Sequence, residues 1–456
     1  MKTDRIIVII FIISLLLRLS AVFVAMKDDR YNPYNRVKGD ATSYIALATS
    51  LARGDGYSDH YEGSPDDFFK DPGSIKSIHR PPTYKKPPGY PVFLSIIFYL
   101  FGWRLVLVLL IQALLSSFSV VLIYLIGKEI SCRNTALISS ILAAFYYQFC
   151  YRATTIMVET LLVFLTLVFF YNLVLWYKKM RYLSGFMTGF FAGLAFIVRP
   201  IILPAVPLFL LFAFLNNKRY DLKRLCLGAV LLVLGVAMIL APLVARNYRH
   251  TGHFLVTPTF GGYQFLLLYN PHNLNWPIYT TDPGFMTEDY PGFTKYITED
   301  LKVDLPASAS PVLREYEQDK VYGTTAFRFI LSNPGHFFKT LPRTFRNMWK
   351  LDYPVSRLSG RTENIGVLSD RVTFWIFRLN NFICYVCMIP FALFGLYVAA
   401  RKRHEPSFLV ALFFCYFVFF HTLIATNMRH RLTIMPFFFI LAALGINELL
   451  KKKAAL

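Results

Sequence analysis

The chain has 456 residues, of which 55% are hydrophobic and only 16% are charged, and its mean hydropathy is +0.45. Soluble domains carry roughly 25% charged residues, so this composition argues against an ordinary soluble protein. The net charge of +21 is of the size found in nucleic-acid-binding proteins. Here, however, the basic residues gather in short turns beside apolar runs, as the positive-inside rule describes for membrane proteins, and nucleic-acid binding is not expected.

Apolar runs long enough to cross a hydrocarbon core of about 30 Å recur along the whole chain. They predict an all-α polytopic membrane protein with about ten transmembrane helices and both termini in the cytoplasm, because this alternation places every basic turn inside. The first run is too long for a signal peptide and is expected to be retained. The predicted spans are residues 6–26, 103–127, 134–151, 154–176, 182–198, 200–216, 225–245, 374–399, 407–425 and 432–450.

Two long outer loops separate these spans, at residues 27–102 and 246–373. Loops of this length without structure of their own are unusual. In the first loop, Asp40 is placed to cap a helix that stops at Gly54, and the apolar segment 92–102 is short enough to lie in the membrane interface. The second loop has helical patches near 312–331 and 334–350. We therefore predict one membrane domain, residues 1–456, with short interfacial helices and no separate soluble domain.

The acidic residues are the first candidates for chemistry. Of the 27 carboxylates, only Glu159 lies well inside a predicted span, where a charge is costly and indicates function by default. Arg152 precedes it by seven residues, which predicts that both lie on one helix face. The alternative is a structural ion pair between helices. Asp40 has two compatible roles, as a helix cap worth about 1 kcal/mol and as a site carboxylate at a helix N-terminus near the bilayer.

Basic residues at the outer ends of the spans form a second group. Alone, each is typical of a headgroup anchor; together they would make a cationic ring suited to a lipid phosphate. Lipid binding without catalysis is the alternative for this group, which comprises Lys85, Lys86, Arg199, Arg246, Arg429, His430 and Arg431. A metal site built from Asp59, His60, Asp66 and Asp67 would match no zinc or EF-hand spacing.

Several short motifs, in this order along the chain, resemble the GT-C glycosyltransferases, and within them family 39, which includes protein O-mannosyltransferases and the aminoarabinose transferase of lipid A. The motifs are Gly39-Asp40-Ala-Thr-Ser-Tyr44, Gly54-Asp-Gly-Tyr57, Lys86-Pro-Pro-Gly-Tyr-Pro91, Glu159-Thr-Leu, Val198-Arg199-Pro200, Arg246-Asn247-Tyr248 and Arg431-Leu-Thr-Ile-Met-Pro436. The resemblance implies a GT-C-like bundle.

The same resemblance implies roles for individual residues. Asp40 and Glu159 would be the catalytic carboxylates, and Lys86, Arg199, Arg246 and Arg431 would bind the donor phosphate. Supporting residues would be Tyr44, Tyr57, Lys85, Asn247 and His430. In the aminoarabinose transferase a Glu of the metal site precedes the Lys of the Lys-Pro motif, whereas Lys85 stands here. A divalent metal is therefore possible but has no support from the spacing, and no other cofactor is expected.

The implied reaction moves a hexose or pentose from a polyprenyl-phosphate carrier to an acceptor hydroxyl on the outer face of the membrane, with inversion at the anomeric carbon. The acceptor would be a glycolipid, a polysaccharide or a protein. The lack of an Asn-x-Ser/Thr sequon favours the plasma membrane of a prokaryote. Two alternatives remain: a transporter or flippase of lipid-linked sugars, and a non-catalytic component of envelope assembly.

Overall fold

The structure is a computed structural model that describes residues 5–27, 40–58, 83–216, 221–270, 311–349, 370–402, 406–424 and 428–454. All regular elements in these ranges are helices. They are α1 Arg5–Lys27, α2 Asp40–Arg53, α4 Gly89–Phe101, α5 Leu105–Ile130, α6 Arg133–Phe145, α7 Tyr147–Ala153, α8 Glu159–Lys179, α9 Tyr182–Val198, η2 Pro200–Ile202, α10 Ala205–Asn216, α11 Leu222–Thr251, α12 Gly261–Leu268, α14 Pro311–Ser332, α15 Pro334–Trp349, α16 Asp370–Cys384, η6 Val386–Met388, α17 Ile389–Arg401, α18 Ser407–Leu423, η7 Met428–Thr433 and α19 Met435–Ala454.

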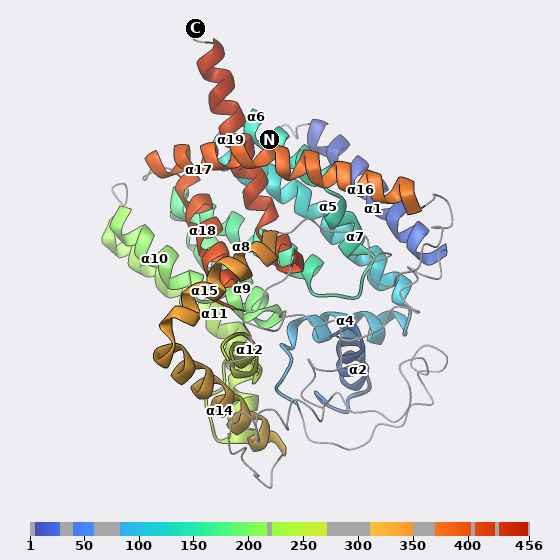
Figure 1. Cartoon of the computed structure of the whole chain (residues 1–456), viewed down its shortest axis with the longest axis vertical. Coiled ribbons are helices and arrows are strands. Elements are labelled where there is room, and N and C mark those ends of the chain that lie inside the picture. Colours follow the sequence, from blue (N-terminus) through green and yellow to red (C-terminus); the bar gives the residue numbers. More distant parts are fainter. Residues whose placement is uncertain are drawn as a thin grey trace.

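Each predicted span corresponds to one helix or to a pair of helices. Within the described ranges, five helical stretches are long and apolar enough to cross a membrane, namely Arg5–Lys27, Leu105–Ile130, Glu159–Lys179, Leu222–Thr251 and Arg378–Arg401; shorter apolar helices include Tyr182–Val198 and Ser407–Leu423. The beginning of α1 and the end of α19 lie at the same end of the bundle, while α2, α4, α12 and α14 gather at the other (Figure 1). The prediction of a helical membrane bundle is confirmed.

Glycines allow the closest helix contacts in the bundle. A Cβ atom added to Gly189 of α9 would overlap the carbonyl of Leu232 in α11, and one added to Gly395 of α17 would overlap the carbonyl of Leu441 in α19. Small residues let two backbones approach in this way inside a membrane, where burial of apolar surface does not drive helices together. The end of α9 and the start of α19 adjoin Arg199 and η7, which belong to the charged region described below.

The predicted helix face shared by Arg152 and Glu159 is wrong. The helix α7 ends at Ala153, and α8 begins only at Glu159, so the two residues lie on different helices. The amide of the buried Gln112 side chain donates hydrogen bonds to the carbonyls of Ala153 (3.2 Å) and Thr155 (2.9 Å). Because a side chain satisfies these carbonyls, the backbone leaves the helical path there. Glu159 consequently occupies the first turn of α8 rather than its interior.

The helices predicted in the two outer loops are confirmed. In the first loop, α2 runs from Asp40 to Arg53 and is followed by Gly54 and Gly56, whose φ angles of +84° and +89° favour glycine and end the helix. The apolar segment after the Pro-Pro turn forms α4. The two patches of the second loop form α14 and α15. Residues Asp59, His60, Asp66 and Asp67, weighed as a metal site, lie outside the described residues.

Candidate functional site

Asp40, in the first turn of α2, is held by two cations from distant parts of the chain. The Nζ atom of Lys86 lies 2.6 Å from its Oδ1 atom, and Nη2 of Arg429 lies 3.0 Å from its Oδ2 atom. Burial alone would raise the pKa of the Asp40 carboxyl, but Lys86 and Arg429 outweigh burial and hold that pKa well below its usual range. Asp40 is therefore ionised at neutral pH and makes ion pairs through both oxygens.

Arg429 also joins Asp40 to the second candidate carboxylate. Its Nε atom lies 3.8 Å from Oε1 of Glu159, whose side chain is 1% exposed. Neither carboxylate oxygen of Glu159 accepts a hydrogen bond from the described residues. Its charge is balanced by Arg429 and by its position in the first turn of a helix, where the backbone N–H groups favour an anion. The two carboxylates thus converge on one guanidinium, although 119 positions of sequence separate them.

Three further predicted residues surround this cluster. The ring of Tyr44 lies 5.8 Å from Nζ of Lys86, and burial, followed by the Asp40 charge, raises the pKa of its hydroxyl. Arg199 ends α9 with a buried Nη1 atom that makes no hydrogen bond to the described residues. Burial, followed by the Arg199 charge, lowers the pKa of His430 well below its usual value. His430 is consequently neutral and adds no charge for an anion.

A network of neutral side chains holds the cluster in place. Tyr90 stacks edge-on against Tyr44 with 5.2 Å between ring centroids, and its hydroxyl donates to Oε1 of Gln112 (2.9 Å). Gln112 in turn fixes the turn that precedes Glu159. On the other side, the hydroxyl of Tyr57 donates to the backbone carbonyl of Lys86 (3.0 Å). The site charges therefore rest on buried partners that belong to α4, α5 and the segment that follows α2.

Glu159 also lines a small hollow of about 260 Å³ inside the bundle. Arg152 lines it too, so the two residues of the wrong helix-face prediction still meet, but across the break between α7 and α8. Ser116, Ser119 and Thr160 add hydroxyl groups to its wall. The hollow therefore places a few hydroxyl groups near the Glu159 carboxylate in a wall that is otherwise largely apolar.

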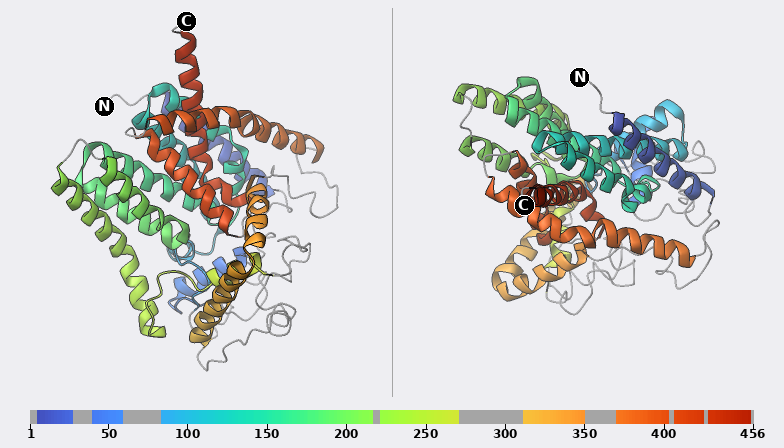
Figure 2. Two further views of the ribbon diagram at one scale, coloured as in Figure 1. Left: turned by 60° about the vertical axis from the view of Figure 1, so that its left-hand side comes forward. Right: turned by 90° about the horizontal axis from the view of Figure 1, so that it is seen from above.

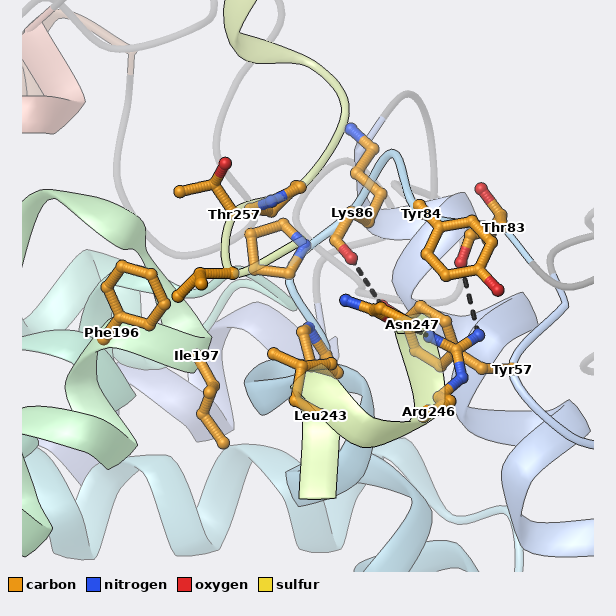
Figure 3. A pocket seen from close by; sticks show the side chains of 14 residues that line it. Tyr57, Thr83, Tyr84, Lys86, Phe196, Ile197, Leu243, Arg246, Asn247 and Thr257 are labelled. Carbon is orange, nitrogen blue, oxygen red and sulfur yellow. Dashed lines mark hydrogen bonds between the residues drawn. The ribbon is translucent and has the colours of Figure 1, made fainter. Parts of the chain in front are cut away.

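Arg246 lies apart from the two carboxylates, in a second hollow. Its guanidinium sits over the rings of Tyr84 (4.8 Å) and Tyr57 (5.2 Å), and Nη1 donates to Oδ1 of Asn247 (3.2 Å). Figure 3 shows that the backbone carbonyl of Lys86 faces this hollow, whereas its side-chain amine points away from it. The segment 83–88 thus separates the cluster around Asp40 and Glu159 from the hollow that contains Arg246.

The hollow beside Arg246 comprises about 350 Å³ of empty space, part of it open to solvent, and has a largely apolar wall. Phe196, Ile197, Leu243 and Val256 contribute this wall, together with the prolines of the Pro-Pro turn. A single guanidinium at the edge of an apolar space is the arrangement that suits a phosphate with a hydrocarbon chain attached.

Arg431, also predicted to bind phosphate, points elsewhere. It is 1% exposed, its guanidinium lies 4.5 Å from the centre of the Tyr385 ring, and Nη1 donates to the carbonyl of Met348 (3.4 Å). The four residues predicted to bind the donor phosphate therefore do not share one site: Lys86 is at the carboxylates, Arg199 is close to Glu159, and Arg246 and Arg431 lie in separate surroundings. Lys85 is half-buried, with its backbone N–H bonded to Oγ1 of Thr83 (3.3 Å).

The residue that joins the carboxylates, Arg429, was one of several outer cations in the sequence and was not singled out as a phosphate ligand. One feature of the sequence points to Arg429. It belongs to the basic run Arg429-His430-Arg431, which lies on the predicted outer side, where the positive-inside rule does not expect basic residues. The described residues include no group of three His, Cys, Asp or Glu side chains placed to hold a metal ion. Arg429 lies between Asp40 and Glu159, so the described geometry does not fit a metal ion bridging these two carboxylates.

Comparison with known proteins gives one family match and several structural matches. Residues 85–244 match the family model for dolichyl-phosphate-mannose-protein mannosyltransferases. The chain resembles the oligosaccharyltransferase of Archaeoglobus fulgidus in its apo form, with a TM-score of 0.50 and 15% identity over 96% of this chain and 51% of that one. The form tethered to an acceptor peptide gives a TM-score of 0.50 with 14% identity, over 96% and 50% of the two chains.

The chain has the GT-C glycosyltransferase fold. It spans about half the length of the Archaeoglobus enzyme. ArnT from Cupriavidus metallidurans, bound to undecaprenyl phosphate, also matches, with a TM-score of 0.42 and 12% identity over 98% of this chain and 78% of that one. No curated protein sequence gives a significant match. The GT-C resemblance predicted from the motifs is confirmed, and with it the architecture of an integral membrane protein.

Proposed function

We propose that this GT-C chain transfers a sugar from a polyprenyl-phosphate carrier to an acceptor hydroxyl on the outer face of a prokaryotic plasma membrane. The observation that carries the proposal is the meeting of Asp40, Lys86, Arg429 and Glu159 at the end of the bundle where α2, α4, α12 and α14 gather. A carboxylate beside two cations supplies a proton acceptor and a phosphate ligand at one place, which glycosyl transfer from a phosphate requires.

The ion pairs of Asp40 give the proposal its mechanism. A carboxylate with a strongly lowered pKa is a poor base. The donor phosphate is itself an anion, and on binding it takes Lys86 and Arg429 as its own partners. Asp40 then loses its two cations, its pKa rises, and it becomes a stronger acceptor for the hydroxyl proton. The base is thus activated only when the donor is in place.

The chemical step follows from these positions. The acceptor oxygen attacks the anomeric carbon, the bond from that carbon to the phosphate oxygen breaks, and the hydroxyl proton passes to Asp40. Lys86 and Arg429 stabilise the charge that develops on the leaving polyprenyl phosphate. A single displacement of this kind inverts the anomeric carbon. Glu159 holds Arg429 in the orientation that the phosphate needs.

Two other cations complete the proposed donor site. Arg199 lies near Glu159 and carries an unbonded Nη1 atom, and Arg246 stands at the mouth of the apolar hollow, where the first part of the lipid chain would lie. Arg431 is left out because Met348 and Tyr385 engage its guanidinium. The match of residues 85–244 to the family model for dolichyl-phosphate-mannose-protein mannosyltransferases makes a polyprenyl phosphate the carrier to test first.

The rival function is transport of a lipid-linked sugar. Secondary transporters place their substrate sites near the bilayer midplane between structural repeats. The carboxylates here lie at the outer end of the bundle, at the first turns of α2 and α8, and the sequence has no visible repeat. This placement favours transfer at one membrane face over movement across it.

Complementation of a deletion strain tests the proposal, with mass spectrometry of the envelope glycans as the measurement. The parental gene should restore a sugar that the deletion removes, and Asp40→Asn should not, at equal protein amounts in the membrane. Asp55→Asn is the matched control, because Asp55 is an exposed carboxylate in the turn after α2. If Asp40→Asn restores the sugar as well as the parental gene does, Asp40 is not the base.

A further inference from the structure

The helix α15 follows α18 into the outer half of the bundle. The hydroxyl of Thr344 contacts the carbonyl of Thr422 in the last turn of α18 (2.6 Å). Five residues later, the ring of Trp349 lies 6.2 Å from that of Phe414, which precedes Thr422 by eight residues. Eight helical residues rise about 12 Å. Since α18 is a predicted span, the C-terminal end of α15 lies deeper in the bilayer than its middle.

One face of α15 is packed, and the opposite face is open. Thr340, Thr344 and Met348 are buried at helical spacing against α18 and η7. On the open side, Phe338 and Phe345 are 67% and 46% exposed. Figure 2 shows α14 and α15 on one flank of the bundle, where nothing in the described part of the chain covers this side.

The open face combines these aromatic rings with cations. Lys339 and Arg346 are exposed and lie seven residues apart, so both project from one side of the helix beside the aromatic pair. The end of α14 continues the pattern with Phe327, Arg328 and Leu331, all exposed.

Residues 320–349 contain no Asp or Glu, although they contain Lys320, Arg328, Lys339, Arg343 and Arg346. Glu315, Glu317 and Asp319 lie earlier in α14, so the stretch with cations alone begins after them and runs through α15. Side chains with aliphatic stems and charged ends, placed beside aromatic rings at headgroup depth, are typical of contacts with lipid phosphates.

We propose that this face of α15, with Phe338, Lys339, Phe345 and Arg346 at its centre, is a binding site for anionic phospholipids of the outer leaflet. The ring of Phe345 inserts between acyl chains, while Phe338 and Lys339, more than a turn further out along α15, lie at headgroup level, and Lys339 and Arg346 contact headgroup phosphates. The site lies outside the proposed catalytic cluster and does not depend on the activity proposed above.

Photocrosslinking in nanodiscs tests this proposal without an activity assay. A benzophenone amino acid replaces Phe338 in the full-length protein, and the nanodiscs contain phosphatidylcholine and phosphatidylglycerol at three to one. Mass spectrometry then identifies the lipid adducts. Each cation that reaches a phosphate is expected to enrich phosphatidylglycerol by about fivefold over its share in the nanodisc. The double variant Lys339→Gln, Arg346→Gln should return the adducts to the bulk ratio.

The same probe at Met238 is the matched control, because Met238 is 60% exposed on α11 within a predicted span and away from the cations of α15. Adducts at Met238 should follow the bulk lipid ratio. Adducts at Phe338 that also follow the bulk ratio would overturn the proposal. So would adducts only to a second copy of the chain, since they would make this face a protein interface.

Discussion

Two arginines in this protein, Arg18 and Arg429, are held by partners of different kinds. Arg18, in the middle of α1, is 0% exposed, and its partners are neutral oxygens: Oγ of Ser116 (2.8 Å) and the carbonyls of Ser14 (3.0 Å), Ala144 (3.2 Å) and Ala143 (3.4 Å). Arg429, in η7, lies instead between the carboxylates of Asp40 and Glu159.

The difference separates a structural cation from a site cation. Ala143 and Ala144 belong to the last turn of α6, whose carbonyls have no partners within the helix. Arg18 satisfies them and thereby stabilises the break between α6 and α7. No incoming anion can exchange with these carbonyls. Arg429 is held by two carboxylates, which are anions like a phosphate. A bound phosphate can therefore replace a carboxylate as the partner of Arg429. We expect changes at the two arginines to affect different quantities.

The largest expected effect is a loss of sugar transfer in the variant Arg429→Met. Loss of one charge-stabilising donor typically lowers a rate by about 10² to 10³, and Arg429→Lys should retain part of the rate. Arg429→Met also leaves Glu159 buried without its cation, which lowers stability. The double variant Arg429→Met, Glu159→Gln should therefore recover thermal stability but not transfer. Recovery of transfer in the double variant would show that Arg429 acts only through stability.

Arg18→Met should lower the stability of the protein and leave the rate of transfer unchanged. The carbonyls of Ala143 and Ala144 lose their donor inside the bundle, which costs about 2 kcal/mol in stability. We expect a lower melting temperature in detergent and an unchanged rate of transfer per folded molecule. A loss of transfer greater than about tenfold in protein that is fully folded would contradict the structural role of Arg18.

The third expected effect concerns pH and the binding of undecaprenyl phosphate. In the free protein, Lys86 and Arg429 hold the pKa of Asp40 well below its usual range. If the phosphate takes these cations, the pKa of Asp40 is higher in the complex than in the free protein. A ligand that raises a pKa binds more tightly as the pH falls toward the pKa of the complex.

Comparison of the parental protein with Asp40→Asn isolates this effect from the titration of the phosphate. At pH 7 the Asn variant should bind undecaprenyl phosphate at least about a hundredfold more tightly, because it no longer competes for the two cations and loss of both cations returns the pKa of Asp40 at least to its usual range. The ratio of the two dissociation constants should begin to fall as the pH drops through the pKa of Asp40 in the complex. A ratio that stays constant between pH 7 and pH 4 would show that Asp40 keeps its partners in the complex.

The smallest expected effect is that of Tyr57→Phe. The hydroxyl of Tyr57 donates to the carbonyl of Lys86 at 3.0 Å, a bond worth about 1 kcal/mol, while the ring that lies beside Arg246 is unchanged. Transfer should fall by about fivefold, mainly through weaker donor binding. Tyr99→Phe is the control, because Tyr99 is 77% exposed on α4.

Local patterns in the sequence were enough to predict most helices. Apolar runs with basic turns predicted the spans, and a cap residue followed by a glycine predicted α2, because these signals involve neighbouring residues only. The break before Glu159 could not be predicted in this way. It depends on Gln112, whose side chain comes from another helix more than forty positions earlier.

The sequence by itself determined that this protein is a helical membrane bundle with Asp40 and Glu159 as its candidate carboxylates, because a charge near a membrane is recognisable from its apolar neighbours. Only the tertiary structure decided which cation joins them. Arg429 and Arg431 stand two positions apart in the 3₁₀ helix η7, where each residue turns about 120°, so they point in different directions. Arg429 meets the carboxylates and Arg431 meets Tyr385, a choice set by the path of the backbone.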